Sequence, residues 1–195
     1  MISRLKHPTY SAYDFTNQYL YVCDCDEILQ FKINFENDSI TATKKGAVAT
    51  GVFCGGLAVD KFQNLFFVDK NKLLGGMQGS LIKRINRDLL LVEKYPCEVI
   101  RLLYDGRETS SAKTVQGIAI EQEYLYWTND SHLDGHGGVH KAFTEPFIRA
   151  EPFQTYEIQD VDKAADITTN ANYLFFVGQQ ARKSGLSDRM PELFI

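Results

Sequence analysis

A short run of aromatic and aliphatic residues recurs four times along the chain, and this repeat constrains the fold more than any other feature. The four runs are Tyr19–Val22, Leu65–Val68, Leu125–Thr128 and Tyr173–Val177. Measured between their leucines, the spacings are 45, 60 and 49 residues. A period of this length is typical of proteins built from repeated supersecondary units.

A second apolar stretch precedes each run by seven or eight residues. In the last three repeats this stretch is Gly56–Asp60, Gly117–Glu121 and Asp166–Asn170. Segments rich in Val, Ile, Tyr, Phe and Trp that are separated by Gly, Asn and Asp are typical of strands. Residues 60–64 have the length of a hairpin connection. Each repeat therefore begins with two antiparallel strands.

Further strands follow the aromatic run in each repeat. The expected third strands include Gly79–Lys83 and Gly137–Lys141, and a short helix is an alternative within residues 86–95, where apolar residues recur at helical spacing. The expected fourth strands are Ile40–Lys45, Glu98–Tyr104 and Gln154–Gln159. Four antiparallel strands in about 45 residues form one blade of a β-propeller.

The sequence thus predicts an all-β chain with about four four-stranded antiparallel blades in one domain, residues 1–195. The expected repeats are about 11–45, 52–104, 114–160 and 164–195. They form either a partial, open arc of a larger propeller or a closed four-blade ring. A ring would use Ile2–Lys6 as the last strand of the fourth blade, which would remove an exposed edge.

Composition excludes several functional classes. The 21 Lys+Arg and 25 Asp+Glu residues give a net charge of -4 without a basic block, which argues against nucleic-acid binding. No apolar run approaches the roughly 20 residues that span a bilayer. The four cysteines, Cys23, Cys25, Cys54 and Cys97, are expected to be ordinary thiols. The first ten residues contain no apolar signal-peptide core, and the compartment stays open.

Two of the repeats resemble known propeller families. The residues Tyr126-Trp127-Thr128-Asn129 resemble the YWTD motif of low-density-lipoprotein-receptor-type propellers, with Asn in place of the final Asp. The segments Gly56–Asp60 and Asn64–Asp69 are similar to NHL-type and gluconolactonase-type blades. Propellers of these families usually have six blades, so the resemblance favours an open arc.

The resemblance also implies roles for residues in the aromatic strands. Asp24, Asp69 and Asn129 end three of the four runs, and in YWTD propellers this side chain forms structural hydrogen bonds between blades. Gly178 stands at the corresponding place in the fourth repeat. Trp127 is expected to pack between blades, because a strand covered on both faces needs large side chains.

A gluconolactonase-type enzyme is the alternative function. That resemblance implies a divalent metal at the channel mouth that polarises a lactone or ester. Its ligand positions correspond here to Gly55, Gln116, Ala164 and Ala165, and of the expected ligand types only Asp69, Asp24 and Asn129 are present. Without converging oxygen ligands, a Ca²⁺-type site is not assembled.

A local cluster gives a second candidate metal site. His132, Asp134 and His136 lie close together after the third aromatic run, and imidazole with carboxylate suits Zn²⁺. The second repeat has Lys72, Leu74 and Gly76 at these places, so the blade itself does not require the cluster. A polar surface loop is the competing interpretation.

The expected function is therefore that of a non-catalytic propeller, used as a scaffold for protein interaction or as a structural subunit of a larger complex. We expect protein partners and no cofactor, with a divalent metal at His132, Asp134 and His136 as the alternative to a polar surface loop. An open arc would leave its two end blades uncovered. The residues expected on these end faces are Tyr19, Tyr21, Phe175 and Phe176.

Overall fold

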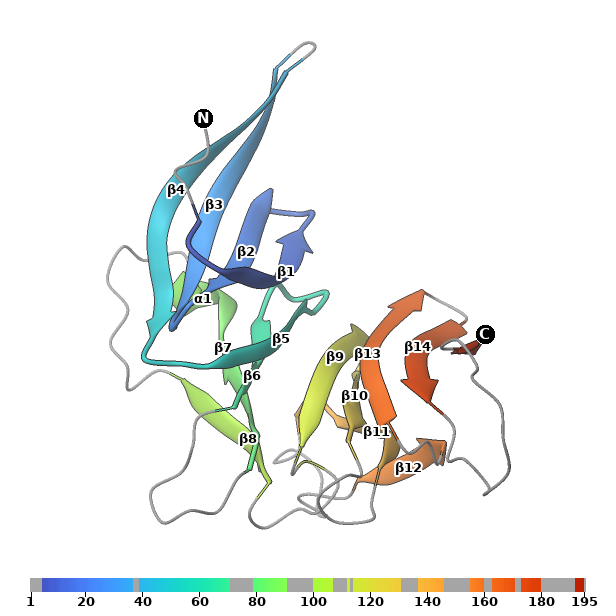
Figure 1. The fold of residues 1–195 in the computed structure, drawn as a ribbon. Helices are drawn as coiled ribbons and strands as arrows, with labels where there is room; N and C mark the ends of the chain where they lie inside the picture. The colour runs from blue at the N-terminus through green and yellow to red at the C-terminus, as the bar shows by residue number, and fades with distance from the viewer. Residues whose placement is uncertain are drawn as a thin grey trace.

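The computed structural model describes residues 5–36, 39–70, 79–90, 100–106, 112, 114–130, 137–145, 155–159, 163–170, 173–179 and 192–194. These residues form four antiparallel sheets that follow one another along the chain (Figure 1). In each sheet, strands that are neighbours in sequence are also hydrogen-bonded neighbours, as in a meander. The prediction of an all-β chain with about four antiparallel blades is confirmed.

Blades 1 and 2 each have four strands. Blade 1 consists of β1 (Pro8–Asp14), β2 (Tyr19–Asp24), β3 (Glu27–Glu36) and β4 (Ser39–Thr50). Blade 2 consists of β5 (Cys54–Val59), β6 (Leu65–Asp69), β7 (Leu81–Ile85) and β8 (Arg101–Asp105), with the short helix α1 (Arg87–Leu90) after β7. This helix lies where the sequence allowed one, and residues 91–95 of that expected segment lie outside the described residues.

Blade 3 has four strands, and three strands are described in blade 4. Blade 3 consists of β9 (Val115–Glu121), β10 (Tyr124–Asn129), β11 (Gly138–Phe143) and β12 (Tyr156–Gln159). Blade 4 consists of β13 (Lys163–Asn170), β14 (Tyr173–Gln179) and β15 (Glu192–Phe194). The first strands of consecutive blades pack side by side, β1 on β5, β5 on β9 and β9 on β13.

Alternation along the second strand of each blade explains how the blades pack. Successive side chains of a strand point to opposite faces of the sheet. In β10, Trp127 joins the apolar cluster shared with blade 2, whereas its neighbour Tyr126 packs into the cluster shared with blade 4. Phe67 in β6 and Phe176 in β14 point toward the preceding blade in the same way as Trp127. All three are buried, as the repeat predicted.

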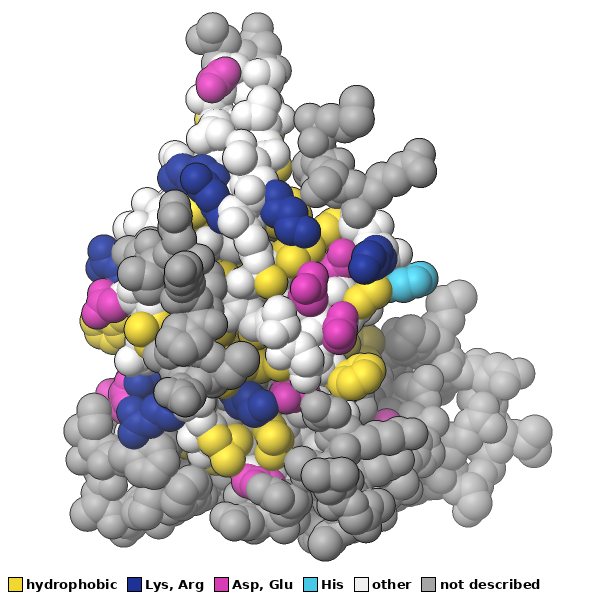
Figure 2. Space-filling model, turned by 90° about the vertical axis from the view of Figure 1, so that its left-hand side faces the viewer, with side chains coloured by type: hydrophobic (Ala, Val, Ile, Leu, Met, Phe, Trp, Pro, Cys, Tyr) yellow, Lys and Arg dark blue, Asp and Glu magenta, His cyan; other side chains and the backbone are white. Residues whose placement is uncertain are grey.

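The third and fourth strands of blade 1 are longer than those of the other blades. β3 has 10 residues and β4 has 12, and the hairpin that they form extends well beyond β1 and β2 (Figure 1). On the side of the molecule that faces away from blades 3 and 4, hydrophobic side chains lie interspersed with charged ones (Figure 2). Near its end the hairpin exposes Phe35 and Ile40, which are paired across the two strands.

The segment that a closed four-blade ring would use as its last strand is described only in part. Leu5 and Lys6 lie outside any strand, and residues 2–4 lie outside the described residues. Leu5 instead packs against an apolar cluster on the outer face of blade 1, formed with Val22 and Phe31. The described part of the segment that a closed ring would use therefore packs on blade 1. No described helix is long and apolar enough to cross a membrane.

Candidate functional site

The residue that ends the second strand holds the chain as it enters the blade, and this contact recurs in three blades. The Phe53 N–H, just before β5, donates to Asp69 Oδ1 at 3.1 Å, and the Thr114 N–H, just before β9, donates to Asn129 Oδ1 at 2.7 Å. In blade 1, the N–H groups of Lys6 and His7 donate to Asp24 at 2.9 and 2.6 Å. Each acceptor fixes the segment that joins its blade to the preceding part of the chain.

The charged acceptors Asp24 and Asp69 are stabilised by the hydrogen bonds that they accept. Burial acts to raise the pKa of Asp24, but the hydrogen bonds from the His7 and Lys6 backbone outweigh it, and the pKa is lowered. The second oxygen of Asp69 accepts a hydrogen bond from Lys83 Nζ at 2.7 Å. Both oxygens of Asp69 are therefore engaged in contacts within blade 2 and at its entry.

Lys70 follows Asp69 and extends from blade 2 toward blade 3. Its Nζ donates to the Gln116 side-chain oxygen at 2.9 Å. Burial lowers the pKa of this amine, partly offset by the negative charge of Asp130. The stem of Lys70 lies over Gly55, where a Cβ atom would come within 2.1 Å of Lys70 Cε. A glycine at this ligand position of the gluconolactonase-type pattern therefore leaves room for a lysine side chain.

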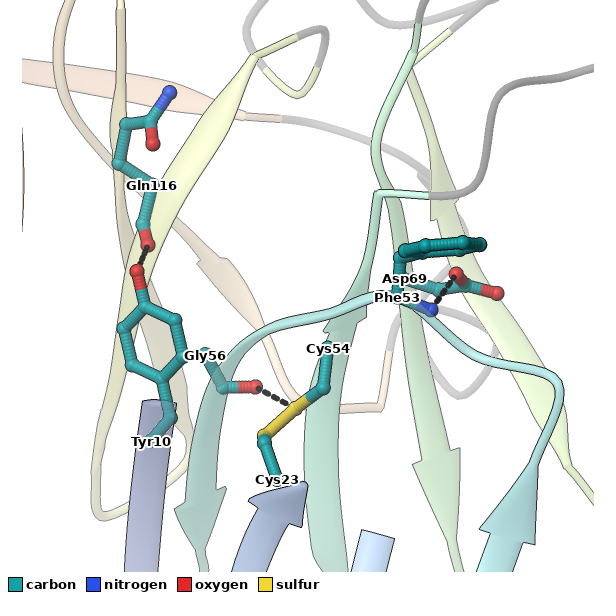
Figure 3. Close-up of a disulfide and its surroundings, with 7 residues drawn as sticks. All are labelled: Tyr10, Cys23, Phe53, Cys54, Gly56, Asp69 and Gln116. Carbon is teal, nitrogen blue, oxygen red and sulfur yellow. Dashed lines mark hydrogen bonds between the residues drawn. A yellow bond between two sulfur atoms is a disulfide. The ribbon is translucent and has the colours of Figure 1, made fainter. Parts of the chain in front are cut away.

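Polar groups on β1, β9 and β13 meet beside this lysine. The Tyr10 hydroxyl donates to the Gln116 carbonyl oxygen at 3.2 Å, which links β1 to β9 (Figure 3). Burial raises the pKa of Tyr10, and the negative charge of Asp166 on β13 raises it further. A Cβ atom at Gly117 would lie 3.0 Å from the Asp166 backbone, so the blades approach closely here.

A cavity of about 580 Å³ opens between blades 1 and 2 at this end of the strands. It is lined by His7, Thr9, Cys25, Phe53, Cys54 and Lys70. Volumes of this size accommodate small organic molecules. Within the described part of the chain, no three His, Cys, Asp or Glu side chains gather to hold a metal ion.

A disulfide between Cys23 and Cys54 lies beside the cavity and corrects the expectation of ordinary thiols (Figure 3). The two Cα atoms are 5.7 Å apart although the residues are separated by 31 positions. Cys25 is free and exposed, and Cys97 lies outside the described residues. The pairing escaped the sequence because its two cysteines belong to different blades, and only the packing of β2 on β5 brings them together.

The candidate zinc ligands His132, Asp134 and His136 lie outside the described residues, so their site stays a prediction. The neighbouring His140 lies in β11, where it stacks on Trp127 with ring centroids 5.9 Å apart.

The residues expected on the end faces occupy three different positions. Tyr19 and Tyr21 pack between blades 1 and 2, and Phe176 packs between blades 3 and 4. The expectation was therefore wrong for these three, because it ignored which face of each strand their side chains occupy. Phe175 points the other way, to the face of blade 4 that no described blade covers. Tyr173 and Val177 share this face by strand alternation.

Solved structures with a similar arrangement are β-propellers. A chain of a nidogen/laminin complex is 14% identical with a TM-score of 0.62, and the match covers 91% of this chain and 58% of that one. A glucose dehydrogenase is 12% identical with a TM-score of 0.60, covering 97% and 60%. The aldose sugar dehydrogenase of Escherichia coli is 14% identical with a TM-score of 0.57, also covering 97% and 60%.

These similarities establish the fold class of the chain, which is a β-propeller. The chain spans about three-fifths of the length of the propellers that it matches. No family model and no curated protein matches the sequence.

Proposed function

We propose that this chain is a non-catalytic propeller component that binds another protein through the outer face of blade 4. The observation that carries this proposal is the exposure of Val177. Its counterparts in the aligned strands β2, β6 and β10 are Cys23, Val68 and Thr128, which are at most 1% exposed. Val177 is 38% exposed.

Phe175, which is half-buried, and Tyr173 lie on the same face as Val177 by strand alternation. Phe175 corresponds to Tyr21, Phe66 and Tyr126, each of which packs into a cluster between two blades. Tyr173, at the start of β14, is 59% exposed. Covering such side chains with another sheet stabilises an assembly by about 1.5–3 kcal/mol for each fully buried large apolar residue.

The chemistry of this face indicates the kind of partner. An exposed apolar sheet face that continues a series of packed blades is complementary to another β-sheet with an apolar face. We therefore propose that the partner supplies a blade-like sheet that packs face to face on β13 and β14. One similar structure is a chain within a protein complex, that of nidogen and laminin, which is consistent with such a use of the fold.

The metal-dependent hydrolase is the less favoured proposal. Its three candidate ligands accept backbone hydrogen bonds at strand starts, and Lys70 lies over the position where a ligand side chain would be needed. Among the similar structures the fold occurs both in a protein complex and in sugar dehydrogenases.

Site-specific photocrosslinking tests the binding proposal. A photoreactive amino acid is placed at Phe175 or Val177 in the native source. The control carries it at Phe62, which is more exposed, at 62% against 38% for Val177, and lies on the β5–β6 turn. We expect crosslinks from residues 175 and 177 to map to strands of one partner and to be absent from residue 62.

Sedimentation of the isolated chain gives an independent measurement. We expect residues 1–195 alone to self-associate, and Val177→Lys to reduce this association. A stable monomer with a cooperative unfolding transition, together with equal crosslinking at residues 62, 175 and 177, would overturn the proposal.

A further inference from the structure

Two cysteines, Cys25 and Cys54, line the cavity between blades 1 and 2, and a third, Cys23, is bonded to Cys54. Cys23 is 1% exposed and lies within the apolar cluster between the two blades. Its disulfide partner Cys54 is partly exposed and lines the cavity. Cys25 lines the same cavity as a free, exposed thiol. The partly exposed member of the disulfide and an unpaired cysteine therefore line the same cavity.

The local backbone keeps Cys25 at this position. It lies in the tight turn between β2 and β3, where Asp24 and Glu27 are the last paired residues. Its φ of 58° is in the left-handed region, which non-glycine residues rarely adopt. The carboxylate of Asp24 anchors the same turn to the backbone of Lys6 and His7. Cys25 is thus held two residues along the chain from Cys23, in the lining of the cavity that Cys54 also lines.

We propose that Cys23, Cys25 and Cys54 form a thiol–disulfide exchange site. The Cys25 thiolate attacks Cys54 Sγ, and a Cys25–Cys54 bond forms as the Cys23–Cys54 bond breaks. The electron pair of the broken bond remains on Cys23, which takes up the proton that Cys25 gave to solvent. One thiol and one disulfide are present before and after the step, so no oxidant or reductant is needed.

Exchange changes which part of blade 1 is tied to blade 2. The Cys23–Cys54 bond joins the end of β2 to the start of β5, within the apolar packing. The Cys25–Cys54 bond instead joins β5 to the exposed β2–β3 turn. A Cys23 thiol would then lie in the apolar cluster, where a free cysteine behaves as a small hydrophobic residue. Breaking the Cys23–Cys54 bond therefore leaves at position 23 a side chain that the apolar cluster can hold.

Disulfide mapping tests the proposal, and the sequence supplies a convenient cleavage pattern. Proteolysis on the amino side of Asp24 and Asp26 separates Cys23 from Cys25. The chain is prepared without reductant in a Cys97→Ser background, incubated between about pH 7 and pH 8.5, where thiolate accumulates, and quenched in acid. We expect both the Cys23–Cys54 and the Cys25–Cys54 peptides, with a ratio that changes during incubation until it is constant.

Two variants keep the test falsifiable. In Cys25→Ser only the Cys23–Cys54 peptide is expected at every pH. In Cys23→Ser the remaining thiol is expected to pair with Cys54 during air oxidation of the folded chain, with circular dichroism checking the fold. The proposal is overturned if the parent protein yields only Cys23–Cys54 throughout, or if folded Cys23→Ser leaves both cysteines free.

Discussion

Blade 1 and blade 4 end the same series of sheets, yet their outer faces differ. On the outer face of blade 1, Phe31 is 2% exposed, and Leu5, Leu20 and Ala42 pack around the cluster to which it belongs. On the outer face of blade 4, Tyr173 is 59% exposed. The chain supplies its own cover at the first end, whereas the apolar face at the other end remains accessible.

The difference shows that a repeated sequence does not give repeated surroundings. Val22 and Phe176 occupy aligned positions in β2 and β14, and both are buried, Val22 by its own blade and Phe176 by blade 3. Phe175 and Tyr21 are also aligned, but only Tyr21 has a described blade opposite it. The site for a partner is therefore expected at the blade 4 end.

The largest effect is expected at the covered face. Phe31→Ala removes a side chain that is 2% exposed and leaves a cavity, which should lower the free energy of unfolding by about 3–5 kcal/mol. Urea unfolding followed by tryptophan fluorescence measures this change. Phe35→Ala, at an exposed position on the same strand, is the matched control and should cost less than about 0.5 kcal/mol. Equal losses of stability in the two variants would show that Phe31 is not buried on the outer face of blade 1.

Reduction of the disulfide should have the next largest effect, because it removes the covalent tie between blades 1 and 2. Cys23 and Cys54 are separated by 31 residues, and closing such a loop stabilises the folded state by about 2–4 kcal/mol. Thermal unfolding with and without a reductant checks this loss. Cys25→Ser, which keeps the bond, should lose as much stability on reduction as the parent. A melting temperature that is unchanged by the reductant would contradict a stabilising Cys23–Cys54 disulfide.

The strand-start contact of blade 1 should make stability depend on pH. The pKa of Asp24 is below the ordinary Asp value of 3.8, so the folded state binds the proton less tightly than the unfolded state. The contribution of Asp24 is therefore complete above that value and is lost as the pH falls through the lower folded-state pKa. Melting temperatures of the parent and Asp24→Asn should differ at pH 7 and converge in acid. A difference that persists below the folded-state pKa would contradict this assignment.

Much of this architecture was predictable because strand formation is local. The aromatic runs and their spacing are visible in the sequence, as are Asp69 and Asn129, which end two of these runs. The structure places them in equivalent strands. What could not be predicted depends on contacts between segments that are distant in the sequence. The Cys23–Cys54 bond and the cover of Leu5 on blade 1 join segments whose proximity no local pattern encodes.

The smallest change in stability is expected at the exposed face of blade 4. It directly tests whether the outer faces of blades 1 and 4 differ. Tyr173→Lys replaces an exposed side chain, so the stability of the isolated chain should change by less than about 0.5 kcal/mol. The same substitution should weaken partner binding, because a charge would have to be buried against an apolar sheet. Unfolding of the free chain and crosslinking yield in the native source measure the two effects separately. Lys61→Ala, on the β5–β6 turn, is a control that should leave both unchanged. A large loss of stability with Tyr173→Lys would mean that this face is already covered within the chain, and the two ends of the arc would then be alike.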